Sequence, residues 1–230
     1  MRSTDNRRGA ESREVVRETG LRPPHGFHPV IDMGDTWQVL DLTKGYDPDA
    51  ISLNPPSIGR YNERRRSMYT TGLFKGVRNI HMGIDIWVPS GTPVCAFADG
   101  RVLFFRDNDQ PGDYGPTIVT EHHVLLDEES PWNPSKNESR GASIPIYALF
   151  GHLSRASMKH VSEGMPLEKG QPFAEVGDVG ENGGWVPHLH FQLSREHPAV
   201  PDMPGVVAPE DLAEALRTYP DPQLVLGPLY

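Results

Sequence analysis

Short stretches of β-branched and aromatic residues, separated by glycine, proline, aspartate and asparagine, dominate the chain from Ile80 onward. Such apolar stretches favour strands, and the residues between them are typical of turns. The pattern predicts a mainly β fold, an antiparallel sheet or sandwich of short strands, in a domain over residues 76–198. The stretches with this pattern are residues 81–88, 92–97, 100–105, 117–126, 144–153, 171–176 and 188–194.

The regions that flank this domain have other patterns. Residues 1–20 are charged and poor in large apolar side chains, which predicts disorder or a frayed helix. Residues 21–75 are rich in proline, glycine and aspartate and show no sustained period, so we expect an extended N-terminal segment with one hairpin around residues 37–42. In the C-terminal region, 199–230, the stretch 208–219 predicts one short helix followed by a proline-rich tail. The N-terminal segment is expected to pack on the core through Phe27, Trp37, Tyr46, Tyr61 and Tyr69.

Two segments of the predicted β domain resemble each other. Residues 90–102 and 169–181 both contain a glycine, a proline two residues later, an apolar stretch and then an acidic residue next to a glycine. Two similar hairpin units that pack together would produce this repetition. Residues 127–143 form a long polar stretch between two predicted strands, and long loops on β scaffolds often line a site.

Charge and composition exclude some classes of partner. The 230 residues carry a formal net charge of −9, which argues against nucleic acid as the main partner because phosphate binding needs clustered lysine and arginine. The run Arg64–Arg66 is a local exception, which we interpret as a solvated face or loop. The sequence contains no apolar run long enough to span a bilayer, and it does not indicate an oligomeric state.

The beginning of the chain and its cysteine content bear on the compartment. The first 20 residues lack the apolar stretch of a secretory signal peptide, so we expect a cytoplasmic protein, or an extracellular or periplasmic one if a leader was removed. Cys95 is the single cysteine, which leaves no internal disulfide and favours a reducing compartment. It lies in a predicted buried strand, where we interpret it as a small apolar residue.

Three short motifs carry side chains that can bind metal or transfer protons. His81 and Asp85 are four residues apart, an even offset that places both on one face of a strand, while the isoleucines between and after them face a core. His188 and His190 are two residues apart and also share one face. His152 follows an apolar strand, just before a turn.

Each motif alone is weak, because a single histidine in a strand is usually structural or exposed. Together the motifs supply three metal ligands and two further histidines, as in catalytic zinc sites with three protein ligands and an open position for water. Zinc lowers the pKa of bound water to about 7, and an imidazole with an ordinary pKa of about 6.5 can move the proton.

The ordered set of motifs resembles the lysostaphin/LytM-type zinc metallopeptidase family. The resemblance covers residues 78–194, about half of the chain, with matching order and approximate spacing. The segments that carry it are HMGIDI, PSGTPVCAFADGRVLF, ALFGHLS, EGMPLEKGQPFAEVGDVG and PHLHFQ.

The resemblance implies a role for each matched position. His81, Asp85 and His190 would bind one zinc ion per chain. His152 and His188 would flank the zinc-bound water, one taking its proton and the other stabilising the oxyanion. The fold implied is an antiparallel β architecture around a groove. The activity implied is a zinc-dependent endopeptidase or amidase that hydrolyses a peptide bond in peptidoglycan or a related peptide.

Other residues near the motifs receive structural interpretations. Tyr114 and Trp185 can line a substrate groove, although packing is the simpler role. His122 and His123 are adjacent and would face opposite sides of a strand, so one can approach the site. The remaining histidines are expected at the surface: His25, His28, His160 and His197.

Three alternative functions stay open. The same fold can serve as a non-catalytic or regulatory binding module, or the enzyme can hydrolyse a soluble intracellular amide. The stretch from Gly91 to Val102 is also similar to hairpin units of phosphotransferase, biotinyl and lipoyl carriers. A biotinyl or lipoyl carrier would need a lysine in a tight turn between methionine or aspartate residues, and the sequence has none.

Overall fold

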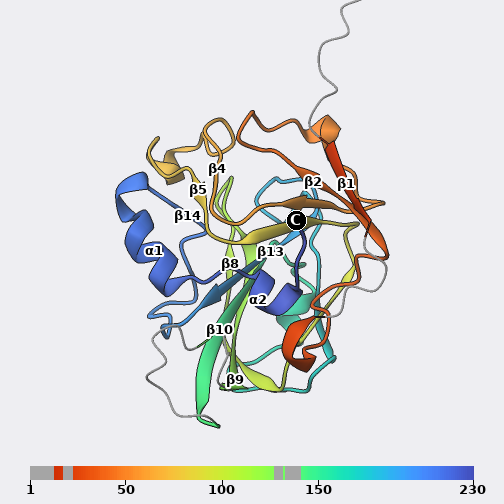
Figure 1. Cartoon of the computed structure of the whole chain (residues 1–230), viewed down its shortest axis with the longest axis vertical. Helices are drawn as coiled ribbons and strands as arrows, with labels where there is room; N and C mark the ends of the chain where they lie inside the picture. The colour runs from red at the N-terminus through yellow and green to blue at the C-terminus, as the bar shows by residue number, and fades with distance from the viewer. Residues whose placement is uncertain (1–12, 18–22, 127–131, 133–140) are drawn as a thin grey trace, which may run out of the picture.

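The computed structural model describes residues 13–17, 23–126, 132 and 141–230, and the fold within them is mainly β (Figure 1). Two α-helices, α1 (Leu212–Thr218) and α2 (Gln223–Leu226), lie near the C-terminus. The strands are β1 (Arg13–Arg17), β2 (Thr36–Leu40), β3 (Ser57–Gly59), β4 (Glu63–Arg64), β5 (Ile80–His81), β6 (Ile84–Trp87), β7 (Pro93–Cys95), β8 (Gly100–Asn108), β9 (Gly115–Leu125), β10 (Ser143–Gly151), β11 (Pro166–Leu167), β12 (Pro172–Glu175), β13 (His188–Ser194) and β14 (Val206–Val207).

Most of these strands form one large sheet. Its order is β1-β2-β3-β6-β13-β10-β9-β8-β11. The predicted antiparallel pairing holds along the sheet except between β2 and β3, which are parallel. The N-terminal segment therefore extends the sheet directly, because its strand β3 pairs with β6, the strand that carries Asp85.

Alternation along the central strands builds the core. Ile84 and Ile86 of β6 and Leu189 and Phe191 of β13 are fully buried in one apolar cluster, as the period of two predicted. The register pairs His190 of β13 with Asp85 of β6. The same alternation that buries the apolar side chains thus sends the polar ones to the opposite face.

The two similar segments of the sequence meet in a second, two-stranded sheet. Strand β7, from the first segment, pairs antiparallel with β12, from the second. The expected packing of two related units is therefore present. We predicted a buried strand at Cys95, but only Val94 of β7 is fully buried and Cys95 itself is half-buried. Burial raises the pKa of its thiol, which keeps it protonated.

Part of the first 20 residues is ordered in a strand. Residues 13–17 form β1 and pair antiparallel with β2, so disorder or a frayed helix is the wrong prediction for these five residues. The rest of that stretch lies outside the described residues, as does most of the polar stretch 127–143. In place of the hairpin expected around residues 37–42, the structure has the single strand β2, which lies between β1 and β3 in the sheet.

The aromatic residues of the N-terminal segment contact the body of the protein. Trp37 is buried in the main cluster, and its indole nitrogen donates to the carbonyl of Leu229 at 3.0 Å. The hydroxyl of Tyr61 donates to the carbonyl of Tyr219 at 2.6 Å. These bonds tie the N-terminal segment to the C-terminal region.

The C-terminal region contains the predicted helix α1 and a second, single-turn helix, α2, in the proline-rich tail. Val225, Leu226 and Leu229 bury their side chains in the main cluster, which explains why the tail is ordered. Helix α2 lies across the front of the sheet in Figure 1. Among the described residues, no helix has the length and apolar character needed to cross a membrane.

Candidate metal centre

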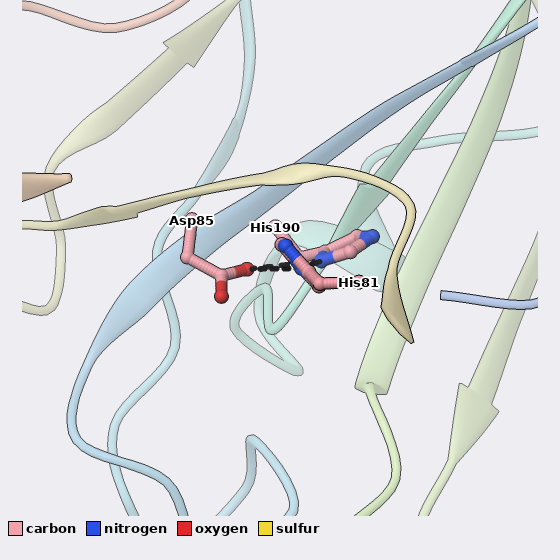
Figure 2. A group of neighbouring side chains, drawn as sticks. All are labelled: His81, Asp85 and His190. Atoms are coloured by element: carbon pink, nitrogen blue, oxygen red, sulfur yellow. Dashed lines mark hydrogen bonds and ion pairs between the residues drawn. The ribbon is translucent and has the colours of Figure 1, made fainter. Parts of the chain in front are cut away.

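Three of the predicted site residues converge at one buried point. His81 ends β5, Asp85 lies in β6 and His190 lies opposite Asp85 in β13, and each is less than 4% exposed. Figure 2 shows the two imidazole rings and the carboxylate pointing toward one another. Each residue offers one ligand atom, and these atoms lie within 4.8 Å of one another. The structure therefore brings together the three residues predicted as metal ligands, and their role as ligands stays a prediction.

The local route from His81 to Asp85 differs from the single strand that we predicted. Met82 and Gly83 break the chain into β5 and β6, and these strands belong to different sheets. A β-carbon on Gly83 would lie 2.5 Å from Cε1 of His190 and 2.9 Å from the carbonyl oxygen of Phe191. Glycine is therefore required at the break, because any side chain there would displace the His190 ring.

We expect Gly83→Ala to lower both stability and metal affinity. The added methyl group must push the His190 ring or the β13 backbone, and such overpacking costs about 1–3 kcal/mol. Thermal unfolding and zinc titration would measure the two effects. Gly180→Ala is the matched control, since a β-carbon there meets no atom within 4 Å. Equal behaviour of the two variants would contradict the packing argument.

The distances within the triad fit a small metal ion. Nε2 of His81 is 3.0 Å from Nδ1 of His190, which is 2.9 Å from Oδ1 of Asp85. The third side, from Nε2 of His81 to Oδ1 of Asp85, is 3.2 Å. Ligand atoms on one tetrahedral zinc, at bond lengths of about 2.0–2.2 Å, lie roughly 3.3–3.6 Å apart. The observed triangle is smaller by only about a few tenths of an ångström.

The outer nitrogen of each triad imidazole is held by an oxygen. Nδ1 of His81 donates to the carbonyl of Arg60 at 2.9 Å, and Nε2 of His190 donates to Oε1 of Gln192 at 3.1 Å. With these outer nitrogens donating, the inner ring nitrogens, Nε2 of His81 and Nδ1 of His190, face Oδ1 of Asp85. In this tautomer the three inner atoms can all act as ligands of one cation, and imidazole–carboxylate sets with fixed outer nitrogens suit zinc.

Burial and charge set the protonation of the triad. Burial, together with the charge of Arg65, lowers the pKa of His81 to about 4, so its ring is neutral near pH 7. Burial alone would raise the pKa of Asp85, but His81 and Arg65 outweigh it and hold that pKa well below its ordinary value. The site therefore offers a neutral imidazole and a carboxylate, the forms that bind metal.

The two other predicted site residues lie together beside the triad. The rings of His152 and His188 have centroids 4.1 Å apart. Nδ1 of His152 donates to the carbonyl of Asn182 at 2.8 Å, and Nδ1 of His188 donates to the carbonyl of Val186 at 2.7 Å. Because each Nδ1 carries the proton, each Nε2 is left as a base. Nε2 of His188 is 3.9 Å from Oδ1 of Asp85, at the edge of the triad.

Burial keeps this second pair of histidines neutral. It lowers the pKa of His188, and it lowers that of His152 well below the ordinary value, where the nearby His188 and His190 act in the same direction. His152 also has a backbone φ of 61°, a value that residues other than glycine seldom adopt. Rare backbone conformations of this kind cluster at functional sites, and no sequence pattern reveals this one.

One buried residue of the site contradicts our interpretation of the sequence. We interpreted Arg64–Arg66 as a solvated face or loop, but the Arg65 side chain is fully buried and contacts Asp85. Arg64 and Arg66 are exposed, as expected. The three-residue run gives no sign of which arginine turns inward, and only the position of β4 beside β5 decides it.

The triad and the histidine pair open into a pocket. Tyr114 and Trp185 are in its wall, so they do line the groove in addition to packing. The hydroxyl of Tyr114 donates to the carbonyl of Met203 at 3.1 Å. Asn182 accepts from the backbone N–H of Trp185 and donates to its carbonyl, both at 3.0 Å, which fixes the turn that carries the indole. Apolar wall residues are Met68, Tyr69, Leu73, Phe74, Met203, Pro204 and Val206.

The remaining histidines lie away from the triad. His122 is fully buried against Phe97 and bonds to Thr120, while His123 faces solvent beside Glu121. The predicted opposite orientation of this pair is confirmed, and neither ring lines the pocket. The predicted surface position is confirmed for His28, His160 and His197, whereas the side chain of His25 lies outside the described part.

These features define a mainly β protein with a buried His-Asp-His cluster and two further histidines in an open pocket. No family model matches the chain. It is 30% identical over 113 residues to the DD-carboxypeptidase/endopeptidase Mpg of Neisseria meningitidis serogroup B, and 27% identical over 113 residues to the peptidoglycan DD-endopeptidase ShyB of Vibrio cholerae. Each match covers 49% of this chain and 20% of the relative, so the chain spans about a fifth of the length of these relatives.

Solved structures of a zinc-containing peptidase and of lysostaphin are also similar to parts of the chain. The catalytic domain of lysostaphin from Staphylococcus simulans is 20% identical, with a TM-score of 0.39 over 70% of this chain and 95% of that domain. A zinc-containing peptidase from Vibrio cholerae is 25% identical, with a TM-score of 0.35 over 50% of this chain and 27% of that one. The resemblance to lysostaphin/LytM-type peptidases that the motifs predict is confirmed by the named DD-endopeptidase relatives.

Proposed function

We propose that the chain is a zinc-dependent endopeptidase or amidase that hydrolyses a peptide bond in peptidoglycan or a related peptide. The observation that carries this proposal is the convergence of Nε2 of His81, Oδ1 of Asp85 and Nδ1 of His190 beside two histidines with free Nε2 atoms. The names of the relatives, which include a peptidoglycan DD-endopeptidase, support this class of substrate.

The residues of the chain divide into a binding set and a proton-transfer set. His81, Asp85 and His190 would hold one zinc ion, which when bound would polarise a carbonyl and make water acidic enough to attack at neutral pH. Nε2 of His188 would take the proton of the attacking water, because it lies at the edge of the triad, 3.9 Å from Oδ1 of Asp85. The carboxylate beside it then stabilises the imidazolium that forms.

His152 completes the proposed chemistry. Its ring lies against that of His188, and its Nδ1 donates to a carbonyl. Nε2 is therefore the ring nitrogen of His152 that is available for proton transfer. The proton that His188 takes from the water would pass to this Nε2 atom. The protonated His152 would stabilise the oxyanion and then give the proton to the leaving amine as the C–N bond breaks. The apolar wall of the pocket, with Trp185 and Tyr69, limits water and gives a peptide a surface to lie on.

Purified cross-linked muropeptides provide the direct test. The zinc-loaded protein should convert them into smaller products that have gained one water per cleaved bond, as identified by mass spectrometry. Treatment with a chelator should stop the reaction and added zinc should restore it. Intact muropeptides in the presence of protein with one bound zinc would contradict the peptidoglycan assignment. A binding module or an enzyme for a soluble amide would then be the better interpretation.

A further inference from the structure

A buried arginine lies directly behind the triad. The side chain of Arg65 is completely shielded from solvent, whereas its neighbours Arg64 and Arg66 are exposed. Burying a guanidinium is costly unless each charge and hydrogen bond is matched. Its position beside a candidate metal ligand therefore requires an explanation beyond surface charge.

The guanidinium is matched on several sides. Nε donates to Oε2 of Glu63 at 2.9 Å, and Nη1 donates to Oδ2 of Asp85 at 2.6 Å and to the hydroxyl of Tyr69 at 3.0 Å. Nη2 reaches the carbonyl of Arg60 at 3.3 Å. Glu63 is itself fixed, since its Oε1 accepts the backbone N–H of Leu42 at 3.1 Å.

These contacts give the two oxygens of Asp85 different tasks. Oδ2 accepts from Arg65, while Oδ1 faces Nε2 of His81 and Nδ1 of His190. The carboxylate therefore presents one oxygen to the centre of the triad. Without the guanidinium, the carboxylate could rotate and present both oxygens.

The same guanidinium also reaches a second ligand through the backbone. The carbonyl of Arg60 accepts from Nη2 of Arg65 and from Nδ1 of His81. A change in the guanidinium position would therefore shift the acceptor that orients the His81 ring. The backbone leaves room for this arrangement at Gly59, where a β-carbon would lie 2.6 Å from Nη2 of Arg65.

We propose that Arg65 is a positioning residue of the metal centre: it holds Asp85 as a single-oxygen ligand and, through the carbonyl of Arg60, orients His81. The proposal rests on the function proposed above and extends it, because it makes residues 59–69 part of the centre. Groups that orient metal ligands typically change metal affinity or activity by about 10- to 100-fold when they are replaced.

Arg65→Lys is the informative variant, with Arg66→Lys as its matched control one residue away. Lysine keeps the charge that balances Glu63 and Asp85, so the protein should fold, but one ammonium group cannot reproduce the four-sided contacts of the guanidinium. We expect zinc affinity, measured by competition with a chelator, to fall about 10- to 100-fold in Arg65→Lys and to stay unchanged in Arg66→Lys. The absorption spectrum of the cobalt(II) protein should change in Arg65→Lys alone, because it reports the number of ligand atoms.

The outcomes separate this proposal from the proposed function. An Arg65→Lys protein that binds zinc with the affinity and cobalt(II) spectrum of the wild type would overturn the positioning role, as would one that fails to fold. Neither result requires any measurement of cleavage. If the wild-type protein binds zinc but cleaves no muropeptide, the proposed function fails while the positioning role of Arg65 is still decided by the affinities.

Discussion

Replacing His190 with alanine is expected to abolish cleavage and metal binding together. The substitution removes one of three converging ligand atoms and leaves Oδ1 of Asp85 without the ring nitrogen that lies 2.9 Å away. Zinc affinity should fall below the range of a chelator competition assay. Activity should fall to that of the metal-free protein, by more than the roughly 10²- to 10⁴-fold effect of losing a proton-transfer group.

His123→Ala is the control for this result. His123 lies in the same sheet, in β9, but its side chain is 58% exposed and faces away from the pocket. This variant should keep the zinc content, activity and thermal stability of the wild type. If His190→Ala kept both its zinc and its activity, the triad would not be the metal site.

Replacing His188 with alanine should separate metal binding from catalysis. His188 lies beside the triad without being one of its three converging ligands, so the variant should retain one zinc per chain. Its kcat for muropeptide cleavage should fall by about 10²- to 10⁴-fold, because the base that takes the proton is missing. Zinc content and steady-state kinetics on the same preparation would check both halves of the expectation.

The matched variant for this second prediction is His152→Ala. It removes the other free Nε2 of the pair and should also spare the zinc while lowering kcat. A His188→Ala protein with wild-type kcat would show that the proton moves by another route. Loss of zinc from His188→Ala would instead place His188 among the ligands.

The strand pattern predicted the parts of the fold and site that depend on alternation. His188 and His190 face one side of β13 while Leu189 and Phe191 are buried on the other, as a period of two requires. His81 and Asp85 meet as predicted, but for a different reason. The chain breaks at Met82 and Gly83, so their proximity comes from two sheets that meet there and not from one flat strand.

Contacts between distant segments could not be predicted from local patterns. No feature of residues 63–66 distinguishes the buried Arg65 from its exposed neighbours. The burial of Arg65 depends on the pairing of β4 with β5, which brings Arg65 within hydrogen-bonding distance of Asp85. Strand β1 was missed for a related reason, since a charged edge strand is ordered by backbone pairing with β2 and needs no apolar period.

The zinc content of the purified protein tests the central claim most directly. After dialysis against metal-free buffer, elemental analysis of the wild type should give about one zinc per chain, the number expected for a single three-ligand site. The same analysis of His81→Ala should give close to none, since that variant loses the Nε2 that lies 3.0 Å from His190 and 3.2 Å from Asp85. A wild-type protein without zinc that also takes up none on titration, or a His81→Ala protein with undiminished zinc, would contradict the account.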